Sequence, residues 1–412
     1  MIIARCFNIG YERGKDEGNI QMRLYPSSLF THATLKDCGE IVTGSTPSKS
    51  NAEFWGGKVP FVTPVQLGFR DPITTANEFV TMDGAERGRM LPKDAVLVCC
   101  IGSLGKTGVA GVPLITNQQI NAIIFDPNQV EARYGYYAAC KLTHLLEHFA
   151  PSTTVKIVKK SSFAKMEIPL PSLAEQKRIA KILDAADAMR AKRREALAQL
   201  DTFLQSTFLD MFGDPITNPM GWNVTLVEDE VHFLTSGSRG WAKYYADSGD
   251  VFIRIQNLKN GKLDLSDIAY VNTPESAEAK RTKVEPGDVL LSITADLGRT
   301  AVIPNDIGKA HINQHLAILR FKELNPVFVS YQLASHGGQS QFVRLNREGV
   351  KAGLNFNDVR RIQLTKPPLP LQHRFATIVK SVEQQKSRMK THLAELDTLF
   401  EALQQRAFNG DL

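Results

Sequence analysis

The chain has 412 residues, of which 43% are apolar and 22% are charged, a composition typical of folded, soluble proteins that excludes a disordered chain. Its longest uninterrupted apolar run, residues 95–101, is too short to span a bilayer, and the charged N-terminus lacks the apolar core of a signal peptide, so we expect a cytoplasmic protein. The net charge of +6 permits a nucleic-acid partner without requiring one.

Residues 1–32 lack the patterning of the rest of the chain, so we expect an N-terminal extension without stable structure, within which Met22 is an alternative start. Residues 33–171 then form a predicted globular domain of mixed helix and strand. Short apolar runs at 60–63, 95–101 and 117–125 predict strands, and 131–149 predicts a helix. The glycine-rich segment 102–108 predicts a loop, and long loops are where recognition residues usually lie.

Residues 172–212 form the first of two long predicted helices. Their apolar residues recur every three or four positions, Ser172 and Glu175 form a capping-box pair, and Gly213 marks the end. At 1.5 Å per residue this helix is roughly 60 Å long. We expect its apolar stripe to form a coiled-coil core, which in this helix comprises Ile179, Leu183, Ala186, Met189, Leu197, Leu200 and Leu204.

The long helix occurs a second time, at residues 368–412. One offset relates the two copies, since 378 − 182, 396 − 200 and 408 − 212 all equal 196 and each pair of positions carries the same residue. Between the helices, residues 213–367 repeat the strand and loop order of the first domain. The chain is therefore a tandem duplication with an α/β (α+β) fold. The predicted coiled-coil core of the second helix comprises Phe375, Val379, Val382, Met389, Leu393, Leu396, Phe400 and Leu403.

Motifs for catalysis or metal binding are absent or incomplete. The loop that carries Lys106 resembles a phosphate-binding P-loop, but Cys100 stands where the motif requires glycine, and the second copy has Arg299 in place of the lysine. His144 and His148 fit a zinc-binding HxxEH pattern that the second copy lacks. The five cysteines form no CxxC pair. We therefore expect no catalytic residue, no metal site and no cofactor bound by this chain.

Specific motifs accompany the repeat. They are Gly44-Ser45-Thr46-Pro47, Val59-Pro60-Phe61-Val62, Asn117-Gln118 and Ile168-Pro169-Leu170-Pro171 leading into Glu175-Gln176, and in the second half Gly287-Asp288-Val289-Leu290, Asn313-Gln314 and Pro368-Leu369-Pro370-Leu371-Gln372. Their order resembles the specificity subunit of Type I restriction-modification systems, from about residue 33 to the end. The second copy departs from the first at Ser236-Gly237-Ser238-Arg239, which replaces Gly-Ser-Thr-Pro, and at Leu371, which replaces Glu175.

The resemblance implies two tandem target recognition domains separated by two conserved helices, which pack as an antiparallel coiled coil with pseudo-two-fold symmetry. Each domain would read one half of a bipartite site in double-stranded DNA, and the helix length would set the gap between the half-sites. The chain itself would be non-catalytic. It would scaffold two modification subunits, adenine-specific methyltransferases that use S-adenosylmethionine, and two restriction subunits, motor nucleases that use ATP and Mg.

Polar and basic residues on the predicted loops are the candidates for DNA contact, because basic side chains bind phosphate and guanine and amides bind adenine. They are Thr46, Lys49, Gln66, Ser103, Lys106, Thr107, Lys156, Lys159, Lys160, Arg239, Lys243, Arg254, Asn257, Arg299, Thr300, His315, Arg344 and Lys351. A structural role is the alternative for the amides, and a merely solvated charge is the alternative for each lysine. The competing function is a coiled-coil adaptor whose duplicated domains bind protein and not DNA.

Overall fold

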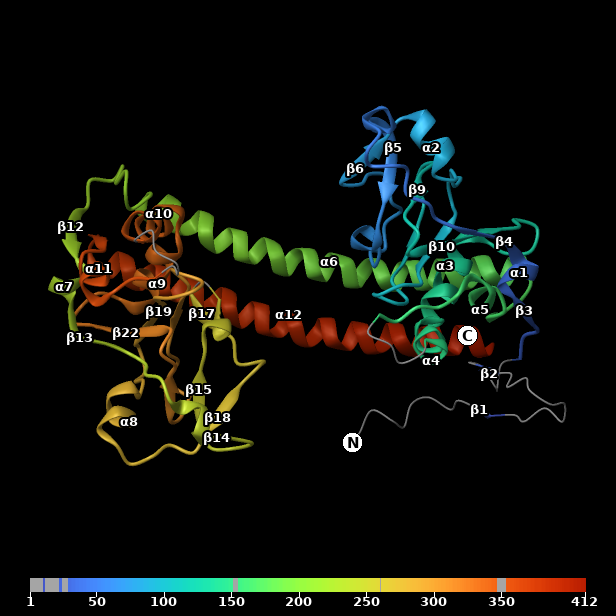
Figure 1. The fold of residues 1–412 in the computed structure, drawn as a ribbon. Coiled ribbons are helices and arrows are strands. Elements are labelled where there is room, and N and C mark those ends of the chain that lie inside the picture. The colour runs from blue at the N-terminus through green and yellow to red at the C-terminus, as the bar shows by residue number, and fades with distance from the viewer. Residues whose placement is uncertain (1–9, 12–21, 24–28, 151–154, 260, 347–352) are drawn as a thin grey trace. The chain divides into compact units, whose positions relative to one another are not determined.

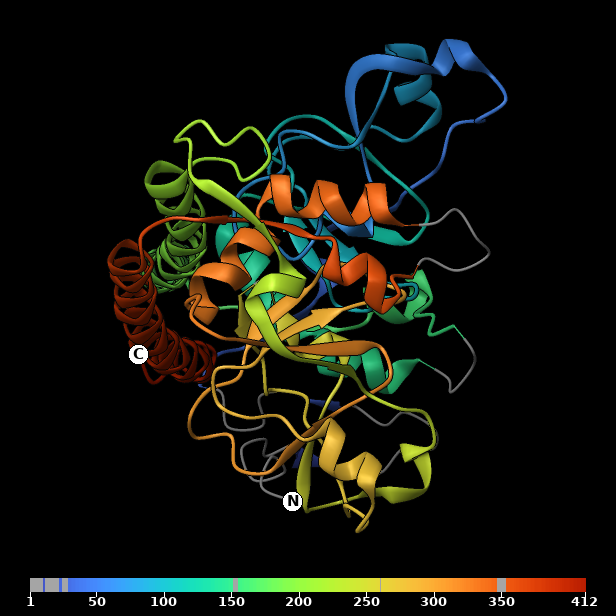
Figure 2. The same cartoon turned by 90° about the vertical axis from the view of Figure 1, so that its left-hand side faces the viewer.

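The computed structural model describes residues 10–11, 22–23, 29–150, 155–259, 261–346 and 353–412, and these form two compact units (Figures 1 and 2). The first unit comprises the chain up to Arg193 together with His392–Leu412, and the second comprises Arg194–Thr391. Each unit therefore contains one globular domain and one end of each long helix. No helix in the described part of the chain combines the length and the apolar character needed to cross a membrane.

The first globular domain is built on a four-stranded antiparallel sheet with the strand order β4-β10-β7-β8. Its strands are β4 (Gly39–Thr43), β7 (Val96–Cys99), β8 (Thr107–Val109) and β10 (Ile120–Phe125). A second sheet, farther from the long helices in Figure 1, contains β5 (Trp55–Val62), β6 (Glu78–Val80) and β9 (Ile115–Thr116). The helices and turns are α1 (Leu35–Cys38), η2 (Ala52–Phe54), η3 (Pro64–Gln66), α2 (Met82–Arg87), α3 (Ala132–Lys141), α4 (Thr143–Phe149) and α5 (Lys160–Ala164).

The second domain repeats this plan, with the equivalent sheet order β13-β22-β19-β20. The strands of that sheet are β13 (Val231–Ser236), β19 (Val289–Ser292), β20 (Thr300–Val302) and β22 (Leu316–Phe321). A second sheet contains β14 (Tyr245–Ala246), β15 (Asp250–Ile253), β18 (Ala269–Val271) and β21 (Ala310–Ile312), and β16 (Leu258–Lys259) pairs with β17 (Lys262–Leu263). The helices and turns are α7 (Val227–Glu230), η4 (Trp241–Tyr244), η5 (Ile255–Asn257), α8 (Ala277–Thr282), α9 (Pro326–Ala334), α10 (His336–Leu345) and α11 (Phe356–Arg360). The predicted duplication is confirmed.

Short two-stranded pairs close each domain next to its long helix. In the first domain β3 (His32–Thr34) pairs with β11 (Glu167–Pro169), and in the second β12 (Asn223–Leu226) pairs with β23 (Gln363–Lys366). The expectation of an unstructured extension at 1–32 falls largely on residues outside the described part. Within that part, β1 (Gly10–Tyr11) pairs with β2 (Met22–Arg23).

Two predicted elements of the first domain differ from the structure. The expected helix at 131–149 is two helices, α3 and α4, that meet at Leu142. The hydroxyl of Thr143 donates to the carbonyls of Cys140 and Gly105, which ties the start of the second helix to the end of the first and to the glycine-rich loop. The strand expected at 117–125 begins only at Ile120, because Asn117 forms a turn by accepting the backbone N–H of Gln119 at 3.1 Å.

The two long helices are α6 (Leu173–Phe212) and α12 (Leu369–Asn409), and the ends of both enter the cores of the globular domains. In the first unit Ile179 and Leu183 of α6 share one core cluster with Phe400 and Phe408 of α12 and with Tyr134 of α3. The start of α6 thus packs with the end of α12. In the second unit the reverse pairing holds, with Leu204, Phe208 and Phe212 of α6 beside Phe375 and Val379 of α12. The packing is antiparallel within each unit.

The prediction that Met189 belongs to the coiled-coil core is wrong. Met189 is 59% exposed, whereas the remaining fourteen predicted core residues are buried or half-buried. The neighbouring Arg190 points inward instead, with its guanidinium 4.2 Å from the ring centroid of Phe400 and an ion pair to Asp397. At this turn of α6 the residue that faces α12 is therefore Arg190, because it has partners on α12, and not the more hydrophobic Met189.

A buried glutamine anchors the start of each long helix. The Oε1 atom of Gln176 accepts the backbone N–H of Glu131 at 2.8 Å, and that of Gln372 accepts the N–H of Asn325 at 2.9 Å. Each amide nitrogen also donates to the carbonyl of a proline five residues earlier, at 2.9 and 2.8 Å. Because Glu131 and Asn325 cap α3 and α9, each glutamine ties a long helix to the equivalent helix of its own domain.

Candidate nucleic-acid interface

Three segments that are distant in the sequence meet at one end of the central sheet of the first domain. The N–H of Cys100 donates to the carbonyl of Gln119 at 2.8 Å, and the carbonyl of Cys100 accepts the N–H of Val158 at 2.9 Å. The N–H of Gly102 donates to the carbonyl of Lys156 at 2.9 Å. We call this meeting of the glycine-rich loop, the turn before β10 and the segment before α5 the loop junction; it comprises residues 100–106, 117–119 and 155–158.

The second domain contains the same loop junction, formed by residues 293–299, 313–315 and 353–354. The N–H of Ile293 donates to the carbonyl of His315 at 2.9 Å, and the N–H of Leu354 donates to the carbonyl of Ile293 at 2.8 Å. These are two of the three bonds of the first junction, with each partner replaced by its repeat equivalent. The exposed side chains differ, however, since Asp296 stands where the first domain has Ser103. One backbone frame thus presents two different sets of side chains.

A glycine with positive φ shapes each glycine-rich loop, at Gly105 (φ +77°) and Gly298 (φ +81°). A Cβ atom at either position would overlap a helix side chain, that of Thr143 or of Gln339. These two side chains also donate to the glycine carbonyls, at 3.4 and 2.8 Å respectively. The helix packed behind each loop therefore fixes the position of the next residue, which is cationic in both domains.

The first loop junction presents several predicted contact residues to solvent. Ser103, Lys106 and Lys156 are exposed, and so are Lys159 and Lys160, which follow directly. Thr46 is half-buried on the loop after β4 and donates to Gln118, in the turn of the junction, at 2.7 Å. Lys49 is exposed in the turn before η2 and contacts the second sheet, where it pairs with Glu78 of β6 at 2.9 Å and lies 5.1 Å from the centroid of the Trp55 ring of β5.

The predicted residues of the second domain occupy a more neutral surface. Arg299 is paired with Asp296, and His315 bonds to Thr294 and Gln314. Arg254 also forms an ion pair, with its Nη2 atom 3.2 Å from Oδ1 of Asp267. Arg239 is exposed next to Ser238, which bridges to Asn313 of the junction, and Lys243 is exposed on η4 at 4.9 Å from the Tyr244 ring centroid.

Arg344 lies at the exposed end of α10, which is tied to the second loop junction because Asn346 accepts the N–H of Gly353 at 3.1 Å. Arg344 and Arg361 together line a shallow cavity of 240 Å³. Arg361 is not among the predicted contact residues, although it belongs to the basic run that precedes the second long helix. Lys351 lies outside the described residues.

Four predicted contact residues are occupied inside the protein. Gln66 accepts the N–H of Thr63 at 2.9 Å, and its equivalent Asn257, which is 2% exposed, accepts the N–H of Arg254 at 2.9 Å. Both amides therefore hold the turn that follows β5 or β15. Thr107 and Thr300 begin strands β8 and β20 and are 3% and 0% exposed. These four side chains are therefore not part of the candidate interface.

Two arginines that the sequence does not single out brace the loops after β4 and β13. Arg89 donates to the carbonyl of Thr43 at 2.8 Å, and Arg281 donates to the carbonyl of Ser236 at 2.7 Å. The two acceptors are repeat equivalents, so the same loop is held in both domains. Within the described residues, no three His, Cys, Asp or Glu side chains lie close enough together to hold a metal ion.

Comparison with known proteins decides the family. The family model described as the Type I restriction modification DNA specificity domain matches residues 28–200 and again 229–398. The chain belongs to this family. It carries two copies of the specificity domain, one in each repeat, and is a specificity subunit of a Type I restriction-modification system.

Relatives and solved structures agree with this assignment. The specificity subunit of the MjaIX enzyme of Methanocaldococcus jannaschii is 23% identical over 92% of each chain. The specificity subunit of the EcoBI enzyme of Escherichia coli is 24% identical over 78% of this chain and 74% of its own. The solved S subunit from M. genitalium matches the fold with a TM-score of 0.52 at 16% identity, covering 94% of this chain and 98% of its own. A chain from a structure of the type I R-M system, solved to explain complex assembly and conformational transition, matches with a TM-score of 0.58 at 18% identity, covering 93% and 98%.

Proposed function

We propose that this specificity subunit reads a bipartite double-stranded DNA target, one half-site with each globular domain, through the two loop junctions. The observation that supports this is the repetition of one hydrogen-bonded backbone frame with different exposed side chains. Two half-sites of different sequence require two different sets of base-contacting groups on supports of the same shape. A structural adaptor that bound the same protein twice would instead be expected to keep the same exposed residues in both copies.

The two domains are suited to different kinds of contact. Four exposed lysines lie at the first loop junction or directly after it, where they would neutralise phosphates; they are Lys106, Lys156, Lys159 and Lys160. In the second domain two arginines, Arg239 and Arg344, are exposed near the described part of the junction, and an arginine can bond two acceptors of a guanine at once. We expect the second half-site to depend more strongly on guanine.

We also propose that the chain is a non-catalytic scaffold for two modification and two restriction subunits, which would supply the chemistry that uses S-adenosylmethionine, ATP and Mg. The internal repeat supports partners that bind in pairs, because it gives the two long helices equivalent surfaces. Phe203 of α6 and Leu399 of α12 are repeat equivalents, since 399 − 203 equals 196, and each is 51% exposed. Large apolar side chains exposed at equivalent positions of two helices suit one partner bound twice.

The experiment that tests the proposed function co-expresses the chain with the modification subunits of its source and sequences the host DNA for methylated adenine. We expect one split motif, with two short half-sites across a fixed gap and methylation on both strands. If the subunits assemble and no methylated motif appears, the chain does not specify a DNA target and the adaptor function stands.

A double change of Lys106→Ala and Lys156→Ala should weaken DNA binding by the assembled modification complex at every sequence tested. Each lost phosphate contact should reduce the slope of log affinity against log salt by about 1, because one fewer counterion is released. Binding titrations at several salt concentrations measure this slope. The control is Lys36→Ala, an exposed lysine of α1 that is not part of the loop junction. An unchanged slope would remove these lysines from the interface.

A further inference from the structure

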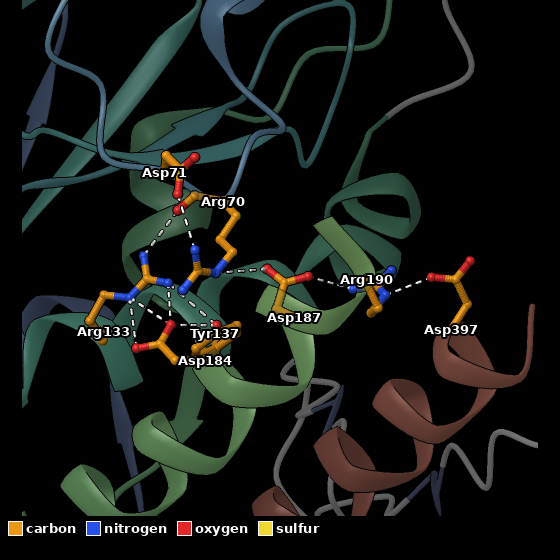
Figure 3. A network of polar contacts seen from close by, with 8 residues as sticks. All are labelled: Arg70, Asp71, Arg133, Tyr137, Asp184, Asp187, Arg190 and Asp397. Atoms are coloured by element: carbon orange, nitrogen blue, oxygen red, sulfur yellow. Dashed lines mark hydrogen bonds and ion pairs between the residues drawn. The ribbon is translucent and has the colours of Figure 1, made fainter. Parts of the chain in front are cut away.

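In the first unit, four charged side chains form a continuous chain of ion pairs from the globular domain to α12 (Figure 3). Arg70, on the loop after η3, lies with its Nε atom 3.9 Å from Oδ2 of Asp187 on α6. Oδ1 of Asp187 accepts from Nη1 of Arg190 at 2.8 Å, and Nε of Arg190 donates to Oδ1 of Asp397 on α12 at 2.6 Å. One acid, Asp187, therefore links the domain to a contact between the two long helices.

A second cluster supports the same loop one helical turn away (Figure 3). Arg133 of α3 pairs with Asp184 of α6 and donates to the carbonyl of Arg70 at 3.2 Å, while the Tyr137 hydroxyl donates to Asp184 at 2.7 Å. Burial alone would raise the pKa of the Asp184 carboxyl, but the bonds from Arg133 and Tyr137 hold that pKa below its usual value. The acid stays charged, and the Arg70 loop is held from both sides.

The second unit contains the same ion-pair chain with different residues. Nζ of Lys262, on β17, lies 3.4 Å from Oε2 of Glu383 on α12, and Nζ of Lys386 lies 2.9 Å from Oε1 of the same glutamate. Lys386 also pairs with Asp201 of α6. The Lys386 side chain is only 2% exposed; burial opposes its charge, but its bonds to Asp201 and Glu383 raise its pKa, so it remains an ammonium ion.

The positions in the two chains correspond through the repeat. The helix members differ by one offset, since 383 − 187, 386 − 190 and 397 − 201 all equal 196. The loop cations come from the same place as well, because Arg70 and Lys262 closely follow Gly68 (φ +97°) and Gly261 (φ +106°). The N–H groups of these glycines donate to the first residues of β8 and β20, at 2.9 and 3.0 Å.

Charge order is retained across the repeat although residue identity is not. Arginine is replaced by lysine at two positions and aspartate by glutamate at a third, while the sign at every position is kept. Burial does not explain this, because buried ion pairs can often be exchanged for apolar residues without loss of stability. What apolar residues do not provide is direction: an ion pair with fixed partners selects one register and one orientation.

We propose that Asp187 and Glu383 are positioning residues that fix the orientation of each recognition domain on the long helices and thereby the length of the gap between the half-sites. The inference rests on the proposed function. One base pair adds about 3.4 Å of rise and about 35° of twist. A domain that could move by a few ångströms on its helices would therefore accept two gap lengths. Each acid is ion-paired with a cation of the domain and with a cation of the helix pair at once, so such a movement breaks the chain of ion pairs.

The test measures methylation rates of the full chain assembled with its modification subunits. The DNA duplexes carry the half-sites found for the unaltered protein, separated by the natural gap or by a gap one base pair shorter or longer. The variants are Asp187→Asn, Glu383→Gln and Asp187→Glu, the last of which places in the first copy the residue that the second copy carries. The matched control is Glu395→Gln, an exposed acid on α12.

We expect Asp187→Asn and Glu383→Gln each to lower the ratio of natural-gap to altered-gap methylation by about tenfold. A change of this size is typical of the coupling between residues of one ion-pair network. The half-site sequences should stay unchanged. Asp187→Glu and Glu395→Gln should keep the ratio. An unchanged ratio in both amide variants overturns the proposal, and so does an equal fall in rate at all gaps, which is the mark of a purely structural residue. If the unaltered complex methylates no split motif, the proposed function itself fails, and this is visible before any variant is made.

Discussion

Replacing Phe212 with alanine should destabilise the second unit by about 3–5 kcal/mol, the range for removing a buried aromatic ring without refilling its space. Phe212 is 1% exposed at the end of α6, with its ring centroid 4.7 Å from that of Phe328 and 5.6 Å from that of Phe375. The ring thus joins both long helices to α9. Urea unfolding measures the loss, and hydrogen exchange should locate it in residues 194–391.

Met189→Ala is the control for this prediction. Met189 follows the same helical periodicity on the same helix, but it is 59% exposed, so its truncation should change the free energy of unfolding by no more than about 0.5 kcal/mol. Equal losses for the two variants would mean that Met189 is a core residue after all, as its spacing in the sequence predicts.

Asp288→Asn should cost the second unit about 1.5–3 kcal/mol, because it removes the charge from a buried, charge-assisted network. Asp288 is 0% exposed; its oxygens accept from Nε and Nη2 of Arg320 at 2.7 and 2.9 Å and from the N–H of Glu285 at 2.7 Å. The hydrogen bond from Arg320 to this carboxylate is the main reason that the pKa of Arg320 is raised. Thermal and urea unfolding of the variant measure the cost.

The control is Asp94→Asn, in the turn that precedes β7 as the turn with Asp288 precedes β19. Asp94 is exposed and has a φ of +67°, in the left-handed region that asparagine tolerates. We expect little change in stability. A loss at Asp94 as large as that at Asp288 would show that the cost comes from the turn and not from the ion pair.

Features that depend on neighbouring residues were predictable from the sequence. The long helices expected at 172–212 and 368–412 are observed at Leu173–Phe212 and Leu369–Asn409, because their periodicity and end signals are local. The duplication was predictable for a related reason: one offset relates the two long helices, and offsets within three residues of it relate the motifs between them, so two copies of one fold follow without knowledge of a single contact.

The roles of individual polar residues were less predictable. Gln66 and Asn257 suit adenine contact by residue type, yet both amides cap turns within their domains. Thr107 follows a glycine-rich loop in the sequence, but it begins a buried strand. Residue type states which bonds a side chain can make, and only the fold decides which partners are within reach.

By itself the sequence determined that the chain is a duplicated specificity protein with two long helices and two α/β domains, because these properties lie in local periodicity, repeated spacing and contiguous motifs. Only the tertiary structure decided which residues act together. Arg190 and Asp397 are 207 positions apart, and Lys386 and Asp201 are 185 apart, so no local pattern joins them. They meet because each domain's own core brings opposite ends of α6 and α12 together, and charged side chains then occupy inner positions that a hydrophobic stripe would assign to residues such as Met189.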